Sequence, residues 1–170
     1  MKLGEFQRPA IDGNWGYGWR IVWYIVNALV FQSAIVGLLP SRAKAALLRL
    51  FGARVGTGFV CKPGVNIKYP WFLNVGDYVW LGEGVWIDNL CRVEIGNNVC
   101  ISQGVKILTG SHDWSRPDFP FFALPVTIGD HVWITAHRVI RPGVEIPPQV
   151  AVLADIGRRD AEQAYAKLQA

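Results

Sequence analysis

The sequence predicts an all-β fold in which hexapeptide repeats wind into about four to five coils, preceded by N-terminal helices. Three observations predict it. A six-residue period begins at Val55 and returns at Ile128 after a break, and its first position is aliphatic everywhere except at Cys61. Its fifth position is mostly Val, and its second position is often Gly. Extra residues follow the third, sixth and ninth hexads, which indicates a coil with three sides.

The first-position residues form the expected core of the coil. They are Val55, Cys61, Ile67, Val75, Leu81, Ile87, Ile95, Ile101, Ile107, Ile128, Ile134, Ile140, Ile146 and Val152. The valines of the fifth position are expected to point inward as well, at Val65, Val79, Val85, Val99, Val105, Val132, Val144 and Val150. Gly at the second position and Gly or Asn at the fourth suit tight bends between short strands. Three strands and three bends therefore make one turn of about eighteen residues.

The insertions define the limits of the coils. Two extra residues follow the third hexad, two follow the sixth, and a long excursion over 109–125 follows the ninth. Because each insertion closes a third hexad, all of them should leave from the same edge of the prism. The coils then cover 55–74, 75–94, 95–127 and 128–145, with an incomplete fifth coil from 146.

Composition and charge restrict the classes of function. At 170 residues the chain is expected to hold one β-helix domain over 53–157, a helical segment over 1–52 and a short helix or tail over 158–170. The net charge of +4 is mild and suits a solvated basic face, and no nucleic-acid partner is predicted. The cysteines have no metal-type spacing, and Cys61 and Cys91 are expected to be small buried side chains in a reducing compartment.

An uncharged apolar run over 21–39 follows an irregular segment over 1–19. The run is long enough to cross a bilayer core, although Asn27, Gln32 and Ser33 argue against a full span. Three interpretations stay open. The run packs as a helix on the repeat domain or on a neighbouring subunit, or it lies on a membrane as a helix, or it spans the membrane or acts as a signal.

A second helix is expected after Pro40, which ends the first. Ser41 is its expected N-cap and Gly52 its stop signal. Apolar Leu47, Leu48, Leu50 and Phe51 and basic Arg42, Lys44 and Arg49 make this helix amphipathic. Such a helix either rests on anionic lipid or caps the open end of the coil. The protein is expected in the cytoplasm. Peripheral contact of residues 20–51 with the inner face of the cell membrane stays an expectation.

Four stretches carry a resemblance to a known family. The four stretches are KPGVNIKYPW, GEGVWIDNL, CISQGV and TGSHDWSRPDFP. They resemble the hexapeptide-repeat acyltransferases, and among them the O-acetyltransferases of colanic acid and exopolysaccharide synthesis. The resemblance covers residues 50–153 and implies a left-handed parallel β-helix. It also implies a homotrimer with active sites between adjacent prisms, acetyl-CoA as the donor, and a sugar hydroxyl as the acceptor. The apolar N-terminus favours a lipid-linked glycan as the molecule that carries this sugar.

The long insertion carries the candidate catalytic residue, His112. Moving an acetyl group from a thioester to a hydroxyl requires removal of the alcohol proton, and an imidazole near neutral pH suits this general-base role. The alternative is that His112 only braces the loop. His131 lies at a bend, and His137 is retained as a ligand contact. These histidines fall on different edges or coils, so no metal site is predicted.

Four residues are candidates for binding the acceptor or for orienting His112. Asp113 and Trp114 follow His112 directly, and a catalytic His needs a second group that fixes its ring. The resemblance places Asp88 and Asn89 where acceptor-side residues are found. Asp and Asn also form bends readily, so a purely structural role stays open for both.

The resemblance implies that the donor lies along the later coils, where the matching residues are Trp133, Thr135, Ala136 and Arg141. Arg138 and Arg141 could meet the donor's phosphates, whereas Arg158 and Arg159 are typical of surface charges. Thr135 stands where the family usually has Gly, and Arg138 stands at an inward position. An unpaired charge inside the prism is costly, so either this hexad is distorted or Arg138 has a partner.

The hexads also stop before the closing segment that is usual in the family. The donor site could therefore be incomplete. This leaves a second hypothesis beside the acetyltransferase, namely a catalytically weakened or non-catalytic β-helix scaffold.

Overall fold

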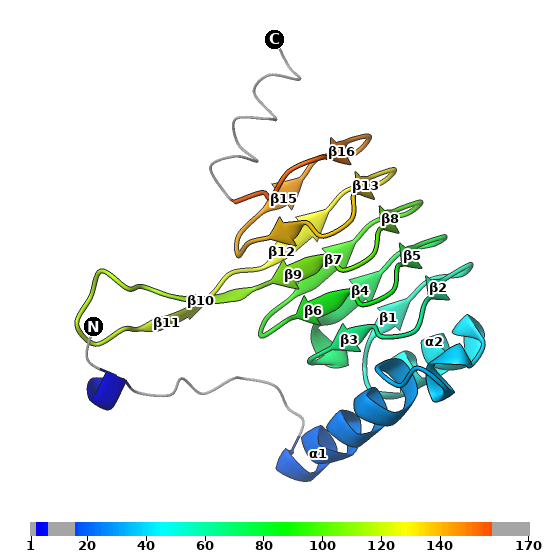
Figure 1. Ribbon diagram of the computed structural model, residues 1–170, viewed down its shortest axis with the longest axis horizontal. Coiled ribbons are helices and arrows are strands. Elements are labelled where there is room, and N and C mark those ends of the chain that lie inside the picture. The colour runs from blue at the N-terminus through cyan, green and yellow to red at the C-terminus, as the bar shows by residue number, and fades with distance from the viewer. Residues whose placement is uncertain (1–2, 7–15, 158–170) are drawn as a thin grey trace.

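The computed structural model describes residues 3–6 and 16–157 of the chain. Within them, short strands wind into a left-handed parallel β-helix, and helices lie across one end of it (Figure 1). The fold class predicted from the hexads is confirmed. The predictions made for 158–170, and for most of residues 1–19, lie outside the described residues.

Three parallel sheets form the sides of the prism, and successive turns add strands to each. Sheet A contains β1 (Arg54–Val55), β4 (Leu73–Val75), β7 (Val93–Ile95), β12 (Val126–Ile128) and β15 (Glu145–Ile146). Sheet B contains β2 (Val60–Cys61), β5 (Trp80–Leu81), β8 (Cys100–Ile101), β13 (Trp133–Ile134) and β16 (Ala151–Val152). Sheet C contains β3 (Asn66–Ile67), β6 (Trp86–Asp88), β9 (Lys106–Leu108) and β14 (Val139–Ile140).

The first-position residues of the hexads stack on one another through the core, as predicted. In sheet A, Val55 lies beside Val75, and Val75 lies beside Ile95. The first-position side chains are at most 8% exposed. Each fully buried aliphatic side chain contributes about 1.5–3 kcal/mol to stability. The fifth-position valines are also buried, except that Val150 in the last turn is half-buried.

The insertions leave from a single edge of the prism, between sheets C and A, which we call the insertion edge. The first contains the 3-10 turn η4 (Pro70–Phe72), and the second is the turn over 89–92. The third forms an antiparallel hairpin of β10 (Gly110–His112) and β11 (Phe121–Ala123). The fifth coil is incomplete in the described residues, where Ile156 forms a single bridge to Ile140 after β16.

The second-position glycines are required by the close approach of successive turns rather than by bend conformation. A Cβ atom at Gly96 would lie 2.8 Å from the carbonyl carbon of Gly129 in the next turn. The left-handed backbone occurs instead at the fourth position, where Gly104 has φ +65°. His131 and His137 adopt φ +57° and +60° at equivalent turns, and both are exposed.

The apolar run over 21–39 is not one helix, which corrects the sequence prediction. The α-helix α1 (Tyr17–Val26) continues into a π-helical turn, η2 (Asn27–Phe31), and the chain then bends before the 3-10 turn η3 (Val36–Leu38). Asn27 is buried where the helix meets the prism, so the apolar run wraps over the β-helix. A further 3-10 turn, η1 (Leu3–Glu5), lies near the N-terminus. No helix in the described ranges is both long and apolar enough to cross a bilayer.

Helix α2 (Ser41–Leu50) begins at Ser41, the residue expected to be its N-cap, because Pro40 occupies the N-cap position. The Ser41 hydroxyl instead accepts a hydrogen bond from the Cys61 N–H at 3.0 Å. Gly52 ends the helix as predicted, with φ +91°. Lys44 is fully buried, so it is not part of a basic outer face.

The helices close the open edge of the first coil. In later coils, the carbonyl of a first-position residue accepts a hydrogen bond from the preceding turn, as Leu81 does from the Lys62 N–H at 3.0 Å. The first coil has no preceding turn. Side chains of α2 replace it, since Arg49 donates to the Val55 carbonyl and Lys44 Nζ donates to the Cys61 carbonyl at 2.8 Å.

Sheet C is closed in the same way by the first helix. The Trp23 indole N–H donates to the Ile67 carbonyl at 2.9 Å, and the Asn27 side-chain oxygen accepts from the Ile67 N–H at 3.4 Å. Trp23 and Phe51 pack ring against ring above the first coil. The interpretation of this region as a cap on the prism is therefore confirmed, and we call residues 17–50 the cap.

Burial sets the chemistry of the ionisable groups beneath the cap. It raises the pKa of the Cys61 thiol to about 12, although the nearby Lys44 ammonium acts in the opposite direction. Burial also lowers the pKa of Lys44. Cys91 was expected in the core but is only half-buried, because it lies in the turn at the insertion edge and not on a strand.

Packing of the cap is tested by neighbouring leucines of α2. Leu48 is 0% exposed and Leu50 is 63% exposed. We expect Leu48→Ala to lower the free energy of unfolding by about 2–5 kcal/mol, because it leaves a cavity between the cap and the first coil. Leu50→Ala should change it by about 0.5 kcal/mol or less. Urea unfolding followed by circular dichroism measures both, and equal effects would contradict this packing.

Candidate active site

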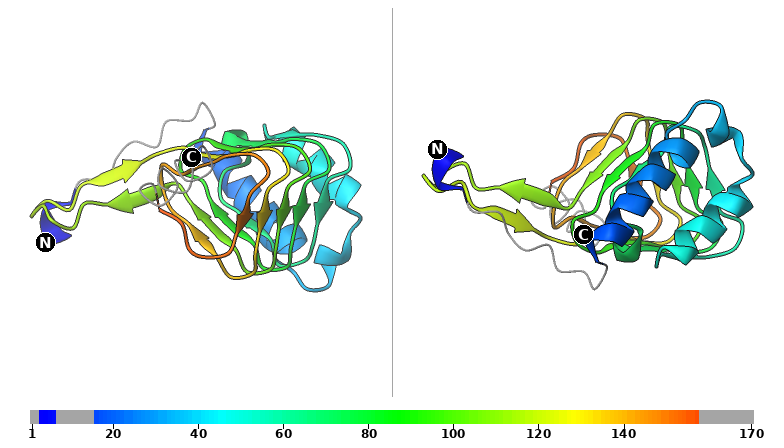
Figure 2. Two further views of the ribbon diagram at one scale, coloured as in Figure 1. Left: turned by 90° about the horizontal axis from the view of Figure 1, so that it is seen from above. Right: turned by 90° about the horizontal axis from the view of Figure 1, so that it is seen from below.

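His112 lies on the hairpin that leaves the insertion edge after β9. It is the last residue of β10 and pairs with Phe121 of β11. The hairpin projects away from the prism (Figures 1 and 2). Its root is held by Thr109, whose buried hydroxyl accepts a hydrogen bond from the Leu90 N–H at 2.8 Å. His112 therefore lies on a projecting hairpin whose root is fixed to the prism by the Thr109 hydrogen bond.

Aromatic rings enclose the His112 imidazole. Phe119 stacks on it with the ring centroids 4.3 Å apart and an interplanar angle of 5°. Phe121 and Phe6 approach it edge-on, at centroid distances of 5.4 and 5.2 Å. These contacts leave the ring half-buried and restrict its rotation. The residue Phe6 reaches this site from the N-terminal segment, far away in the sequence.

The hydrogen bond at His112 fixes its tautomer. Nδ1 lies 3.0 Å from the Phe119 carbonyl oxygen, and a carbonyl can only accept, so Nδ1 carries the proton. The other ring nitrogen, Nε2, then has a free lone pair, and it has no hydrogen-bond partner among the described residues. Phe119 holds its carbonyl there with φ +47°, a strained conformation for a residue other than glycine.

The expected orienting residue, Asp113, bonds Ser115 within this chain, whereas the His112 ring bonds Phe119. The Asp113 Oδ1 accepts hydrogen bonds from the Ser115 hydroxyl at 2.6 Å and from the Ser115 N–H at 3.0 Å. These bonds hold the pKa of the Asp113 carboxyl below its ordinary value. Trp114 is exposed on the hairpin. The orienting group of His112 is therefore a backbone carbonyl.

Asp88 and Asn89 lie at the insertion edge of the second coil. They differ in whether their side-chain polar atoms remain available to a ligand. Asn89 is fully buried, and its amide bonds both the N–H and the carbonyl of Tyr69, at 3.0 and 2.6 Å. Asn89 is therefore occupied in building the bend. Asp88 remains partly exposed and forms an ion pair with Lys68 at 2.7 Å, without the alignment of a hydrogen bond. Asp88 is thus the more accessible of the two to a ligand.

The expected donor-binding residues lie on the fourth turn. Trp133 is exposed on the outer face of β13, and its indole N–H donates to the Ser102 hydroxyl at 3.0 Å. The Thr135 hydroxyl donates to the Val152 carbonyl at 2.8 Å. Ala136 follows in the same turn, and Arg141 is exposed after β14. Of these, Trp133 and Arg141 present their side chains outward.

Arg138 has partners, which resolves the question raised by its inward position. Its Nε donates to the Ala136 carbonyl at 2.9 Å, and one terminal nitrogen lies 3.4 Å from the Leu153 carbonyl. The guanidinium therefore satisfies carbonyls of the fourth and fifth turns, and the hexad pattern continues into β14 without distortion.

One chain does not bring the predicted residues together. Trp133 and the turn that holds Thr135 and Ala136 belong to sheet B and to the edge between sheets B and C. His112 projects from the insertion edge between sheets C and A. Arg141 lies on the insertion edge, one turn beyond the hairpin.

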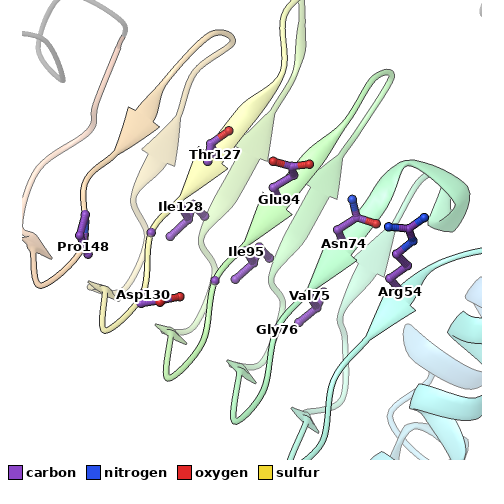
Figure 3. Close-up of a pocket in the computed structure, with 12 residues that line it drawn as sticks. Arg54, Asn74, Val75, Gly76, Glu94, Ile95, Thr127, Ile128, Asp130 and Pro148 are labelled. Carbon is purple, nitrogen blue, oxygen red and sulfur yellow. The ribbon is translucent and has the colours of Figure 1, made fainter.

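A shallow groove crosses the outer face of sheet A and is separate from these residues (Figure 3). Its polar lining includes Arg54, Asn74, Glu94, Thr127 and Asp130, and none of the predicted site residues lines it. Asp130 is already bonded to the Asn97 N–H at 2.6 Å. The described residues also contain no cluster of His, Cys, Asp or Glu that could hold a metal ion.

Comparison with known proteins identifies the family. No protein-family model matches the chain. The chain is 40% identical over 125 residues to the putative colanic acid biosynthesis acetyltransferase WcaF of Escherichia coli strain K12, covering 74% of this chain and 68% of the relative. The chain belongs to the hexapeptide-repeat acetyltransferases. It is also 32% identical over 106 residues to the galactoside O-acetyltransferase of the same strain, covering 61% of this chain and 52% of that protein.

Solved structures of hexapeptide-repeat acetyltransferases share the fold. One from Vibrio cholerae, complexed with acetyl coenzyme A, superposes with a TM-score of 0.71 at 23% identity, covering 85% of this chain and 79% of that one. A maltose O-acetyltransferase from Clostridium difficile gives 0.55 at 21% identity, with 82% and 78% covered. The family suggested by the sequence motifs is thus confirmed, and this chain is an acyltransferase.

Sequence reasoning missed the groups that hold the site residues in place. The roles of Phe119 and Phe6 have no sequence signal, because they depend on a backbone carbonyl and on a distant segment. The pairs Lys68 with Asp88 and Tyr69 with Asn89 are each twenty residues apart, the length of the second coil. Reading across coils at that spacing could have found both pairs.

The His112 tautomer is directly measurable. In protein labelled with ¹⁵N-histidine, long-range ¹H–¹⁵N correlation spectra should show a protonated Nδ1 and an unprotonated Nε2 for His112, because Phe119 offers only an acceptor. His112→Gln assigns the signal, and exposed His131 serves as the reference. A His112 ring protonated at Nε2 and bare at Nδ1 would contradict this geometry.

Proposed function

We propose that this protein is an O-acetyltransferase that moves an acetyl group from acetyl-CoA to a sugar hydroxyl in exopolysaccharide synthesis of the colanic-acid type. The observation that carries the proposal is the oriented His112, with Nδ1 bonded to the Phe119 carbonyl and Nε2 free. Membership of the acetyltransferase family supports the reaction class. The names of the relatives, colanic acid and galactoside acetyltransferases, support a sugar acceptor.

In the proposed reaction, His112 acts as the general base. Its Nε2 takes the proton of the acceptor hydroxyl while the hydroxyl oxygen attacks the thioester carbonyl carbon. The tetrahedral intermediate then collapses, the carbon–sulfur bond breaks, and the leaving sulfur receives the proton from the imidazolium. The Phe119 carbonyl stabilises that imidazolium through Nδ1–H throughout. Contacts with the neighbouring aromatic rings hold the imidazole in position for this transfer.

The complete site is proposed to form between chains of a homotrimer. The hairpin that carries His112 extends away from its own prism, whereas Trp133 lies on sheet B, so a neighbouring prism beside the hairpin would supply the donor-binding face (Figure 2). Trp133 of that neighbouring prism would contact the donor arm. Exposed Arg141, which shares the insertion edge with the hairpin, would meet the donor phosphates from the chain that carries His112. Thr135 and Ala136 would offer their turn rather than free polar side chains, since the Thr135 hydroxyl is already bonded.

The acceptor is proposed to be a sugar unit of a lipid-linked glycan, met at the inner face of the cell membrane. Partly exposed Asp88 at the insertion edge and exposed Trp114 on the hairpin are the candidates for holding it. Carboxylates and exposed indole rings are typical of sugar contacts, because they combine hydrogen-bond acceptors with a flat apolar face. Asp113 and Asn89 are assigned supporting roles in the hairpin and the bend.

The second candidate function is a catalytically weakened scaffold with an incomplete donor site, the alternative that the sequence leaves beside the enzyme. The fifth coil forms β15 and β16 and then only a single bridge at Ile156 within the described residues. Calorimetric titration with acetyl-CoA separates the two functions. Binding supports the enzyme, and its absence supports the scaffold.

Replacement of His112 tests the chemistry. We expect His112→Ala to lower kcat at least about 100-fold, because general-base catalysis contributes roughly 100- to 10,000-fold. Thiol release from acetyl-CoA in the presence of candidate glycans measures this. His131→Ala removes an exposed turn histidine and should leave the rate unchanged. Full turnover by the His112 variant would exclude the general-base assignment.

Two tryptophans of sheet B test the donor face. Trp133 on β13 and Trp80 on β5 are both exposed on the same sheet, separated by β8. If the donor lies along the later coils, Trp133→Ala should raise the KM for acetyl-CoA roughly three- to tenfold through loss of an aromatic contact. Trp80→Ala should leave that KM unchanged. The reverse pattern would place the donor elsewhere on the sheet.

A further inference from the structure

We propose that the outer surface of the cap binds the surface of an anionic membrane. This surface comprises the exposed side chains of residues 17–42, at the end of the prism where the first coil lies. Membrane binding there is independent of the chemistry at His112, because the hairpin leaves the third coil and not the first.

The cap surface is unusually apolar for an exposed helix face. Leu29, Ile35 and Leu38 are 60%, 82% and 74% exposed. The other exposed large apolar side chains of this surface are Tyr17, Ile21, Val22, Tyr24, Ile25, Val36 and Leu39. No charged residue is exposed between residues 16 and 41. An exposed apolar patch of this kind indicates an interaction surface.

The inner face of the same helices is already used, so the exposed apolar residues are not a misplaced core. Trp23 and Phe31 are fully buried against the prism, and Asn27 bonds the edge of sheet C. Figure 2 shows α1 and α2 lying across the end of the prism. Their outward sides therefore form one broad face that points away from the β-helix.

The charges around this face indicate what covers it. Residues 13–76 contain no Asp or Glu, while Arg42, Arg49, Arg54 and Lys62 are exposed on α2 and the first coil. Among the described residues of the cap and the first coil, the exposed charges around the apolar face are therefore all basic. Basic side chains near a bilayer are attracted to anionic headgroups while apolar side chains enter the interface. A second copy of this chain would instead bring two sets of these basic charges together, which is unfavourable.

The depth of binding follows from helix length. α1 has 10 residues and η2 adds 5, and the chain then bends before η3. Such short helices lie in the plane of the interface and do not cross it. Tyr17 is 79% exposed at the start of α1, and tyrosine is enriched at membrane–water boundaries. The cap surface thus has the features of a peripheral membrane contact.

Vesicle co-sedimentation of the full chain tests the proposal. We expect binding to phosphatidylcholine vesicles that contain phosphatidylglycerol, weaker binding to phosphatidylcholine alone, and a decrease with added salt. Leu29→Glu combined with Leu38→Glu should weaken binding at least about tenfold, because it places two charges in the apolar face. The matched control is Leu153→Glu, which is 70% exposed in the fifth coil and should bind as the unaltered chain does.

Circular dichroism melting and thiol release with a soluble acceptor should be the same for all variants, which separates lipid binding from folding and from catalysis. Failure to bind either vesicle would overturn the proposal, and so would equal losses for the double variant and for Leu153→Glu. Sedimentation equilibrium tests the alternative that a second copy of the chain covers the cap surface. A drop in the mass of the assembly caused by the double variant alone would show that a second copy covers this face.

Discussion

The structure depends on closing the first turn of a β-helix that has no turn before it. Each strand of a coil leaves backbone carbonyls that the preceding coil must satisfy, and a buried carbonyl without a donor costs about 1–3 kcal/mol. Arg49, Lys44 and Trp23 supply the missing donors, one for each sheet. Burying the Lys44 ammonium is unfavourable in itself, as its lowered pKa indicates, but two carbonyls accept from it. The cap is therefore a side-chain replacement for a strand layer, and the later coils are built upon it.

The same regular stacking determines where chemistry can occur. Side chains on the three sheets repeat in rows, so only an edge with inserted residues can carry an irregular constellation. The insertion edge carries η4, the bend of Asn89 and the hairpin of His112, one above the other in successive coils. The hairpin then needs its own local order, because it leaves the support of the prism. The stacked rings and the Phe119 carbonyl, held by a strained backbone, provide this local order. They leave one ring nitrogen of His112 available.

Hexad register predicted the core, the three sheets and the common edge of the insertions because each of these follows from spacing along the chain. Roles that depend on backbone groups from other coils were not accessible in that way. Ser41 was expected to cap its own helix but accepts from Cys61, and Lys44 was expected on a basic outer face but is buried. Asp113 was expected to orient His112, yet it bonds Ser115. Side-chain donors and acceptors satisfy whichever backbone group lies nearest in space, and sequence neighbours do not reveal that group.

Because the donors that close the first coil come from side chains, only three residues of the cap satisfy its outer carbonyls at Val55, Cys61 and Ile67. A chain beginning at residue 53 would present three parallel strand edges, at Val55, Cys61 and Ile67, to the solvent. Exposed strand edges of this kind can pair with the same edges of a second copy. Such a truncated chain would therefore be prone to association through its first coil. The cap thus also protects the protein against edge-to-edge aggregation.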